Sequence, residues 1–313
     1  NNLRPREYDG SFLRFPGMNP EISLRPHQRN AVARILFGGN TLVAHSVGAG
    51  KTMVMGAAAM EKKRLGLCNK TLIIVPNHLT EQMGSELLSL YPNANILVST
   101  RHDFEKNRRK LFCSRIATGN YDIVIMGHSQ FSRIPLSSER QQKFLQDEIE
   151  RYTQEIASAK KEKSGQDLTI KQMEATKKRL QSHLEELMDS PKDDVVTFEQ
   201  LGVDSLMVDE AHEFKNLAVT TKMQNVAGIS TSESQKATDL LMKTQYLDEI
   251  TGGRGLVFCT GTPISNSPVE LYTMMRYLQA STLRAHDLLS FDAWAANFGQ
   301  TTTSIELAPE GTG

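Results

Sequence analysis

The chain has 313 residues, 39% of them hydrophobic and 23% charged, which is the composition of a globular protein of one or two domains. Its 36 basic and 36 acidic side chains give a formal net charge of zero, which argues against a basic, tail-type nucleic-acid binder. The three cysteines, Cys68, Cys113 and Cys259, lie far apart in the sequence, which is typical of a reducing, cytoplasmic compartment and argues against a clustered zinc site. No apolar run is long enough to span a membrane. Because the chain begins at Asn1 and ends at Gly313 without a closing element, we expect it to be a fragment of a longer protein.

Short β-branched runs alternate with helical patterns, which predicts a mostly parallel sheet covered by helices. The predicted strands are Thr41–Ala44, Thr71–Val75, Ile96–Ser99, Asp122–Met126, Ser205–Val208 and Gly255–Cys259. The predicted helices are Gln28–Phe37, Thr52–Arg64, Thr80–Leu90, Phe104–Ile116, Glu233–Ile250 and Val269–Leu278. The first five strands are nearly continuous in large aliphatic residues, as are strands that are buried on both faces, so we expect a doubly wound α/β domain.

Residues 138–192 interrupt this alternation, because they are highly charged and nearly free of β-branched residues. Two apolar seams with a 3-4 spacing flank a turn at Lys163–Asp167, which predicts a coiled-coil-like hairpin of two antiparallel helices. The seams consist of Leu145, Ile149, Tyr152, Ile156 and Ala159, and of Ile170, Met173, Lys177, Leu180, Leu184 and Leu187. The hairpin is either a solvated spacer or an arm that contacts DNA or a partner.

A glycine-containing loop, His45 to Thr52, follows the first predicted strand and precedes an alanine-rich helix. Glycines allow backbone N–H groups to converge on phosphate oxygens, and the helix N-terminus adds its positive dipole end. Lys51 can reach the β- and γ-phosphates, and the Thr52 hydroxyl can bind Mg²⁺. His45 occupies the position where this motif usually has its first glycine. The predicted ATP-binding residues of the loop are Val47, Gly48, Ala49, Gly50, Lys51 and Thr52.

An acidic sequence, Asp209-Glu210-Ala211-His212, follows the fifth predicted strand. In a phosphate-loop protein, an acidic residue at the end of a strand holds Mg²⁺, which is the role we predict for Asp209. Glu210 is then placed to act as the general base that polarises the attacking water. Lys51, Asp209 and Glu210 are therefore the candidate catalytic residues, and Thr52 and Asp209 are the candidate metal ligands.

In this order the motifs resemble the first RecA-like lobe of superfamily 2 helicases and translocases, and the Swi/Snf-type branch looks most similar. The acidic sequence resembles motif II, and Thr260–Pro263 with its extension to Ser267 resembles motif III. The resemblance implies a P-loop ATPase that hydrolyses Mg²⁺-ATP and moves on DNA, usually duplex DNA. It also implies that ATP hydrolysis is coupled to DNA by His212, Thr260 and Thr262.

Other segments resemble further elements of this family. Leu24–Gln28 resembles its adenine-recognising element, which implies that Gln28 reads the adenine edge and that Arg25 lies near the nucleotide. The phosphate loop departs from the Swi/Snf pattern, because His45-Ser46 stands where that branch usually has Asp-Glu. The segments that resemble DNA-facing loops contain Pro76, Asn77, His78, Gly127, His128 and Ser129, although plain loops need no such function. A basic cluster of Arg101, Lys106, Arg108, Arg109 and Lys110 is either a solvated helix face or a further DNA contact.

The resemblance divides the chain into an N-terminal extension (1–23), a RecA-like ATP-binding lobe (24–280) that contains the hairpin, and the start of a connection (281–313). In the family an arginine from a second lobe stabilises the γ-phosphate. No such lobe is present in these residues, so we expect the isolated chain to be nearly inactive. A narrower resemblance is to the helicase portion of phage and conjugative-element proteins, and it is carried by three segments: His45–Thr52, Glu210–Leu217 and Phe291–Gly313. These proteins often carry an adenine-specific DNA methyltransferase and are linked with antirestriction.

Two other functions remain open from the sequence. One is an RNA helicase lobe with the same motifs, although Arg25-Pro26-His27-Gln28 and the Swi/Snf-like motif III argue against it. The other is a nucleotide-binding scaffold that recruits partners through the hairpin. The presence of Lys51, Asp209 and Glu210 argues against a scaffold, which has no chemical need for all three. Cys259 is predicted to be a buried strand residue, and Phe291, Trp294 and Phe298 are predicted to line the core face of a helix.

Overall fold

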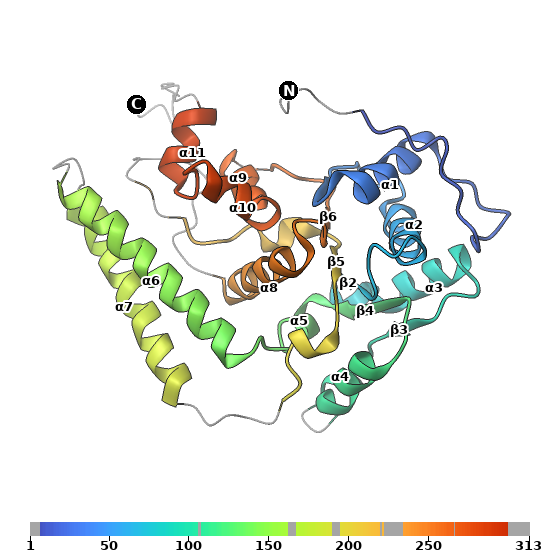
Figure 1. Ribbon diagram of the computed structural model, residues 1–313, viewed down its shortest axis with the longest axis horizontal. Coiled ribbons are helices and arrows are strands. Elements are labelled where there is room, and N and C mark those ends of the chain that lie inside the picture. Colours follow the sequence, from blue (N-terminus) through green and yellow to red (C-terminus); the bar gives the residue numbers. More distant parts are fainter. Residues whose placement is uncertain are drawn as a thin grey trace, which may run out of the picture.

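A computed structural model describes residues 7–105, 108–161, 167–189, 195–219, 221, 234–265 and 267–299. Its centre is a sheet with strand order β1-β6-β5-β2-β4-β3, in which all pairings are parallel (Figure 1). The strands are β1 (Thr41–Val43), β2 (Thr71–Val75), β3 (Ile96–Val98), β4 (Ile123–Gly127), β5 (Ser205–Val208) and β6 (Leu256–Cys259). The six predicted strands are thus confirmed to within a residue at each end.

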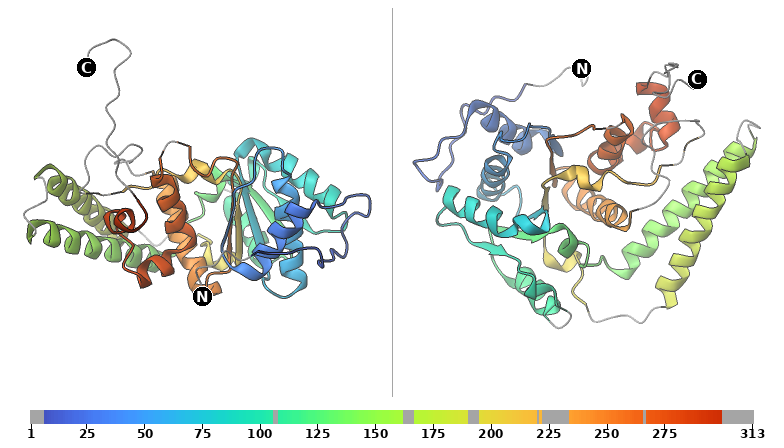
Figure 2. Two further views of the ribbon diagram at one scale, coloured as in Figure 1. Left: turned by 90° about the horizontal axis from the view of Figure 1, so that it is seen from above. Right: turned by 180° about the vertical axis from the view of Figure 1, so that it is seen from behind.

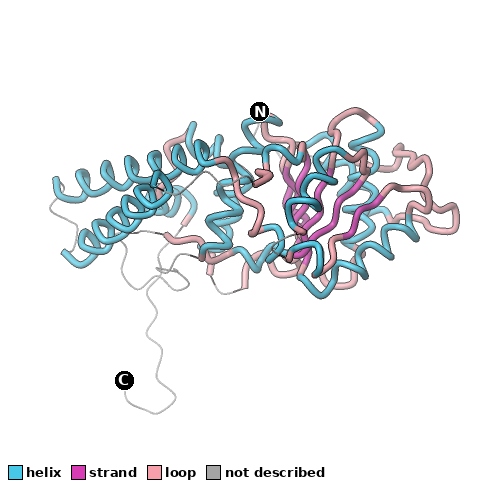
Figure 3. Tube along the Cα trace, turned by 90° about the horizontal axis from the view of Figure 1, so that it is seen from below, coloured by secondary structure: helices cyan, strands magenta, loops and turns pink. Residues whose placement is uncertain are grey.

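Helices cover both faces of the sheet (Figure 3). Leu72 and Ile74 of β2 pack with the helices of one face, whereas Ile73 and Val75 of the same strand pack with those of the other. One face carries α1 (Pro26–Gly38), α2 (Lys51–Arg64) and α3 (Thr80–Leu90), and the other carries α4 (Arg109–Thr118), α8 (Gln235–Thr251) and α9 (Val269–Leu278). The predicted doubly wound α/β fold is confirmed. Within the described ranges, no helix is both long and apolar enough to cross a membrane.

One predicted helix begins later than expected. The sequence pattern favours a helix from Phe104, but α4 begins at Arg109 and a separate 3-10 turn, η2, covers His102–Phe104. The Asp103 carboxylate accepts hydrogen bonds from the backbone N–H and the hydroxyl of Thr100, both at 2.7 Å, and so closes this turn on itself. Because Phe104 is buried, the turn anchors the loop to the core.

Two short helices, α10 (Ala280–Ala285) and α11 (Phe291–Phe298), follow α9. Phe291 and Trp294 are buried in a small apolar cluster with Tyr272 of α9, as predicted for one face of a helix. Phe298 is 62% exposed and does not belong to this core, so the prediction was wrong for this residue. Cys259 is fully buried in β6, as predicted.

The charged insertion forms two antiparallel helices, α6 (Ser138–Lys161) and α7 (Asp167–Asp189), which project away from the sheet (Figures 1 and 2). Their predicted seams meet in a separate core around Leu145, Tyr152 and Met173. Lys177, the polar member of the second seam, is half-buried. Most of the predicted turn lies outside the described residues. The predicted hairpin is therefore confirmed as a unit that packs largely against itself.

The root of the hairpin is attached to the main body through Arg140 and Phe144. Arg140 forms an ion pair with Glu249 of α8 at 2.8 Å, and its guanidinium lies 4.5 Å from the ring centroid of Tyr246. Phe144 packs against both the main core and the hairpin core. The chain enters and leaves the hairpin side by side, because the N–H of Phe198 donates to the carbonyl of Pro135 at 2.8 Å.

Deletion of residues 138–192, with a short Gly/Ser bridge in their place, is expected to leave a folded core that still binds nucleotide. Pro135 and Phe198, which flank the deletion on either side, already lie close together, and partly exposed ion pairs such as that of Arg140 contribute only roughly 0–1 kcal/mol. The measurement is a thermal unfolding curve of both proteins with and without Mg²⁺-ATP. Insoluble protein, or a deletion variant that ATP no longer stabilises, would count against an autonomous insertion.

Candidate functional site

The predicted phosphate loop lies at the carboxyl end of the sheet, between β1 and the first turn of α2. Gly48 and Gly50 have φ angles of 80° and 76°, in the left-handed region that only glycine adopts readily. The Lys51 Nζ donates to the carbonyl oxygens of His45 and Ser46 at 3.2 and 3.3 Å. The ammonium group therefore lies against the loop, beside a helix N-terminus that attracts anions.

Gln28, the predicted adenine reader, is buried and braces the phosphate loop. Its amide nitrogen donates to the carbonyl of Ala49 at 3.1 Å, and its amide oxygen accepts from the N–H of Arg25 at 2.8 Å. A Cβ atom at Gly50 would lie 2.3 Å from this amide nitrogen, so close approach of the side chain requires glycine there. These contacts join α1 to the loop, and adenine recognition by Arg25 and Gln28 stays a prediction.

His45, which replaces the usual first glycine, packs edge-on against His27 with their ring centroids 5.3 Å apart. His27 in turn contacts the carbonyl of Ala49 through its Nε2 at 3.1 Å. Burial, with the nearby His27 and Lys51, lowers the pKa of His45, so the ring is neutral at pH 7. The loop thus accommodates a bulky residue at this position by packing it against a second imidazole.

The acidic sequence begins where β5 ends, and its two carboxylates lie in different environments. Asp209 is 8% exposed, whereas the Glu210 side chain is 31% exposed. Burial, and after it the charge of Glu210, raises the pKa of Asp209 to about 6, although Lys51 acts in the opposite direction. Glu210 has φ 48° and ψ 48°, a left-handed conformation that is uncommon outside glycine and recurs at functional sites.

The residues present fit a magnesium–nucleotide complex. The Asp209 carboxylate is a buried charge that the protein compensates poorly, as its raised pKa indicates. A divalent cation would supply that compensation, and Mg²⁺ prefers carboxylate, hydroxyl and phosphate oxygens. Thr52, in the first turn of α2, offers a hydroxyl of this kind beside Lys51. Bound there, Mg²⁺ would neutralise charge on the phosphates.

A third loop lies between these two, because β6 is inserted between β1 and β5. Thr260 directly follows β6 and is fully buried. Its hydroxyl oxygen accepts from the N–H of Thr262 at 3.0 Å and lies 3.1 Å from the Nδ1 of His212. The same Nδ1 lies 3.2 Å from a carboxylate oxygen of Glu210. The three predicted coupling residues therefore form a chain of contacts from Thr262 through Thr260 to His212, which also contacts the candidate base.

A second connection between these loops was not predicted from the sequence. The Glu270 carboxylate, 8% exposed, accepts from the Ser265 N–H at 2.6 Å and from the Lys215 Nζ at 2.9 Å. Lys215 follows the acidic sequence, and Ser265 belongs to the extension of the Thr260 loop, of which Asn266 lies outside the described residues. In the sequence, the only signal for this connection was the position of Glu270 in the first turn of a predicted helix. Glutamates are common there in helices that connect no loops.

Replacement of Asp209 by asparagine is expected to raise the free energy of unfolding of the magnesium-free protein at neutral pH. The pKa of Asp209 is raised from 3.8 to about 6 in the folded protein, so folding favours the protonated form. The wild-type protein therefore loses stability as the pH rises from about 4 to about 6, by at most about 3 kcal/mol. Urea unfolding should show that the difference in free energy of unfolding between the two proteins widens as the pH rises from about 4 to about 6 and then levels off.

A difference that is constant with pH would contradict this expectation. Mg²⁺-ATP provides the internal control, because it should stabilise the wild type and not the Asp209→Asn variant.

The two predicted DNA-facing loops meet at the carboxyl ends of β2 and β4. The Oδ1 of Asn77 accepts from the N–H and the hydroxyl of Ser129 at 3.1 and 3.0 Å. Both residues are exposed, as is His78. They line a groove of about 530 Å³ whose further members include Arg101 and Arg133. Two guanidinium groups and several hydrogen-bonding groups are thus available along one surface, and Arg133 was not predicted.

The other three residues of these loops are buried and are not among those that line the groove. Pro76 and Gly127 are buried, and a Cβ atom at Gly127 would lie 2.3 Å from the Oδ1 of Asn77. His128 is 2% exposed, and both of its ring nitrogens contact protein groups. The prediction that His128 touches DNA is therefore not supported by its position, since the imidazole points into the core.

Comparison with known proteins assigns the chain to a family. A family model described as "Probable helicase domain" matches residues 35–310. The chain belongs to this helicase-domain family. "Defense against restriction protein B" of Escherichia phage P1 is 23% identical to this helicase domain over 318 residues, which cover 89% of the chain and 14% of that protein. The predicted resemblance to phage proteins linked with antirestriction is confirmed, and the chain spans only a small part of its relative.

Two similar solved structures come from Sulfolobus solfataricus. The SWI2/SNF2 ATPase core in complex with double-stranded DNA is 15% identical and has a TM-score of 0.51, over 92% of this helicase domain and 41% of that chain. The SWI2/SNF2 ATPase core domain alone is also 15% identical, with a TM-score of 0.45, over 95% and 42% of the two chains. The first of these confirms the predicted RecA-like fold.

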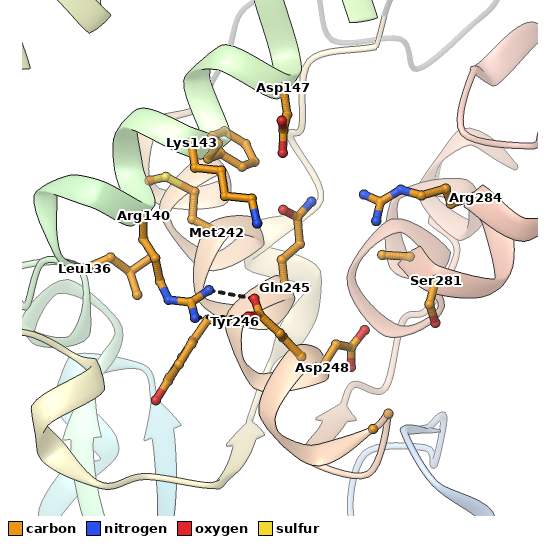
Figure 4. Close-up of a pocket in the computed structure, with 15 residues that line it drawn as sticks. Leu136, Arg140, Lys143, Asp147, Met242, Gln245, Tyr246, Asp248, Ser281 and Arg284 are labelled. Carbon is orange, nitrogen blue, oxygen red and sulfur yellow. Dashed lines mark hydrogen bonds and ion pairs between the residues drawn. The ribbon is translucent and has the colours of Figure 1, made fainter. Parts of the chain in front are cut away.

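A groove of about 560 Å³ lies at the root of the hairpin, away from these loops (Figure 4). Arg140 and Lys143 of α6 face Arg284 of α10 across it, and Arg140 is paired with Glu249. Gly252 and Gly253, which also line it, precede β6, so this groove lies at the amino end of the sheet. It contains none of the predicted nucleotide-binding residues and belongs to the attachment of the hairpin.

Proposed function

We propose that the chain is the ATP-binding motor lobe of an ATP-dependent DNA translocase or helicase, which hydrolyses Mg²⁺-ATP together with a second RecA-like lobe. In this proposal residues 24–280 form the lobe, the hairpin is an insertion, and 281–313 begin the connection to the second lobe. One observation carries the proposal. The phosphate loop, the Thr260 loop and the acidic sequence leave three adjacent strands, β1, β6 and β5, at the same edge of the sheet.

The geometry supports a division of labour in ATP hydrolysis. Lys51 and the loop N–H groups would bind the β- and γ-phosphates, while Thr52 and Asp209 would hold Mg²⁺, directly or through water. Glu210, the more exposed carboxylate, would orient a water molecule and take its proton as that water attacks the γ-phosphorus. The bond from the γ-phosphorus to the bridging oxygen then breaks, which releases ADP and phosphate.

The groove beside Asn77 and Ser129 supports nucleic acid as the partner. Hydroxyl, amide and guanidinium groups of this kind bind phosphate oxygens and carry little sequence information. The solved SWI2/SNF2 ATPase core with the same fold is in complex with double-stranded DNA, which favours a duplex. We therefore expect DNA binding that is independent of sequence and weakened by salt.

The experiment is a phosphate-release assay on the full-length protein that contains this chain, with duplex DNA, single-stranded DNA or single-stranded RNA. We expect the strongest stimulation by duplex DNA, and a fall in apparent DNA affinity as salt increases. Stimulation by RNA alone would favour the RNA helicase alternative. ATP binding without turnover under any of these conditions would favour the scaffold alternative. Residues 1–313 by themselves should hydrolyse ATP at a barely detectable rate, because the arginine finger is expected on the second lobe. Such a finger contributes roughly 10³ to 10⁵ in rate.

A further inference from the structure

His128 connects the acidic sequence to the candidate nucleic-acid groove. The side chain of His128 is 3% exposed. Its Nε2 lies 2.9 Å from the carbonyl oxygen of Asp209, and its Nδ1 lies 3.0 Å from a carboxylate oxygen of Glu213. Because a carbonyl oxygen only accepts hydrogen bonds, Nε2 donates to Asp209. The ring also packs edge-on against Phe214, with the centroids 4.8 Å apart, so the imidazole is held on three sides.

The carbonyl that His128 holds belongs to the peptide between the two functional carboxylates. This peptide joins Asp209, the candidate metal ligand, to Glu210, the candidate base. Glu210 has a left-handed backbone with φ 48°, a conformation that persists only where surrounding contacts impose it. The hydrogen bond from His128 is one such contact. Through this hydrogen bond a movement of His128 would shift the peptide and, with it, both carboxylates relative to the phosphate loop.

The far side of the acidic sequence is fixed independently. Glu213, in the 3-10 turn η4 (Ala211–Phe214), also accepts from the Nζ of Lys236 in α8 at 2.7 Å. The same Nζ lies 4.3 Å from the ring centroid of Phe214. The turn is therefore held between α8 on one side and His128 on the other. Because α8 belongs to the core, displacement of His128 is the more direct way to shift this turn.

The residue after His128 reaches the surface of the groove. Ser129 donates two hydrogen bonds to the exposed Asn77. His128 and Ser129 are consecutive in α5 (His128–Phe131). A phosphate that binds at Ser129 would therefore contact the residue that is covalently joined to His128. Two covalent or hydrogen-bonded steps separate the exposed groove from the Asp209 carbonyl.

We propose that His128 is a positioning residue that transmits the binding of nucleic acid at Asn77 and Ser129 to the Asp209–Glu210 peptide. This inference rests on the proposed function and names a route for its DNA dependence. The route differs from the contact between His212 and Thr260, which joins the acidic sequence to the loop after β6. It also assigns a role to the buried residue of a loop whose exposed neighbours face the groove.

The test compares His128→Leu, which cannot donate a hydrogen bond to Asp209, with His128→Gln, whose amide can still do so. In the full-length protein we expect the kcat of His128→Leu at saturating duplex DNA to fall on the order of 10-fold, a coupling of ordinary size. The DNA-free rate and the Kd values for Mg²⁺-ATP and DNA should change by less than about 2-fold, and His128→Gln should recover much of the stimulation. Ser114→Ala, which removes a hydroxyl that donates to a carbonyl four residues earlier in α4, away from His128, is the control and should leave all these quantities unchanged.

Equal losses of rate with and without DNA would overturn the inference, because they indicate a purely structural role. If His128→Leu does not fold, the exposed end of the route provides the measurement. Asn77→Ala combined with His128→Asn, whose shorter amide does not reach Asp209, should then lose no more DNA-stimulated kcat than the more damaging single variant, and multiplicative losses would contradict a shared route. A wild-type protein that DNA does not stimulate overturns the proposed function and this inference together. Wild-type stimulation that survives intact in His128→Leu overturns this inference alone.

Discussion

Replacement of Lys51 by alanine is expected to abolish the stabilisation of the protein by Mg²⁺-ATP. The Lys51 ammonium lies against the loop carbonyls of His45 and Ser46, within reach of phosphates bound there. A ligand at about 100 times its Kd stabilises a protein by about 2.7 kcal/mol, and this gain is lost when the ligand no longer binds. The measurement is the shift in melting temperature on addition of Mg²⁺-ATP.

Lys171→Ala is the matched control, since this exposed lysine of α7 lies on the hairpin, outside the nucleotide site. It should show the full shift. If Lys51→Ala shows the same shift as the wild type, the assignment of the phosphate loop is wrong. If it melts at a much lower temperature without ligand, Lys51 also stabilises the folded loop through its hydrogen bonds to His45 and Ser46.

Replacement of Glu210 by glutamine should stop ATP hydrolysis in the full-length protein while leaving nucleotide binding intact. The amide retains the shape of the carboxylate but cannot take a proton from the attacking water. General-base catalysis contributes roughly 10² to 10⁴ in rate, so kcat should fall by a factor in this range. Glu210 is also the more exposed of the two carboxylates, so its charge contributes less to a metal site than the buried Asp209 does.

The measurements for Glu210→Gln are single-turnover hydrolysis and the Kd for Mg²⁺-ATP. Glu186→Gln, an exposed position on α7, serves as the control for loss of a negative charge. A kcat that falls less than about 10-fold would remove Glu210 from the role of base, since that is below the usual range. A large increase in Kd would instead place it among the groups that bind magnesium.

Together these variants distinguish nucleotide binding from ATP hydrolysis, whose candidate residues the fold brings close together. Lys51→Ala addresses binding at the loop after β1, and Glu210→Gln addresses hydrolysis at the loop after β5. The loop after β6 lies between them, where the Thr260 hydroxyl contacts His212. Substitutions on this middle loop are therefore expected to act through the acidic sequence, not through loss of nucleotide binding.

The local features of this protein were determined by its sequence. Short β-branched runs predicted all six strands, and the first five are nearly continuous in aliphatic residues, because strands buried on both faces need apolar residues at every position. The phosphate loop and the acidic sequence were found from residue types at short spacing, which reflect chemistry within a few residues. The hairpin was likewise visible from its 3-4 seams, because its two helices pack mainly against each other.

Features that depend on contacts distant in sequence were decided only by the tertiary structure. Nothing in the local pattern places β6 between β1 and β5, yet this order brings Thr260 against His212. Similarly, His128 and Ser129 are adjacent polar residues of one loop, and the sequence predicted the same role for both. Burial separates them, because His128 finds hydrogen-bonding partners more than 80 residues away, 81 and 85 positions along the chain, while Ser129 remains exposed. A polar side chain enters a core only where such partners satisfy it, and those partners are brought together by the packing of the sheet.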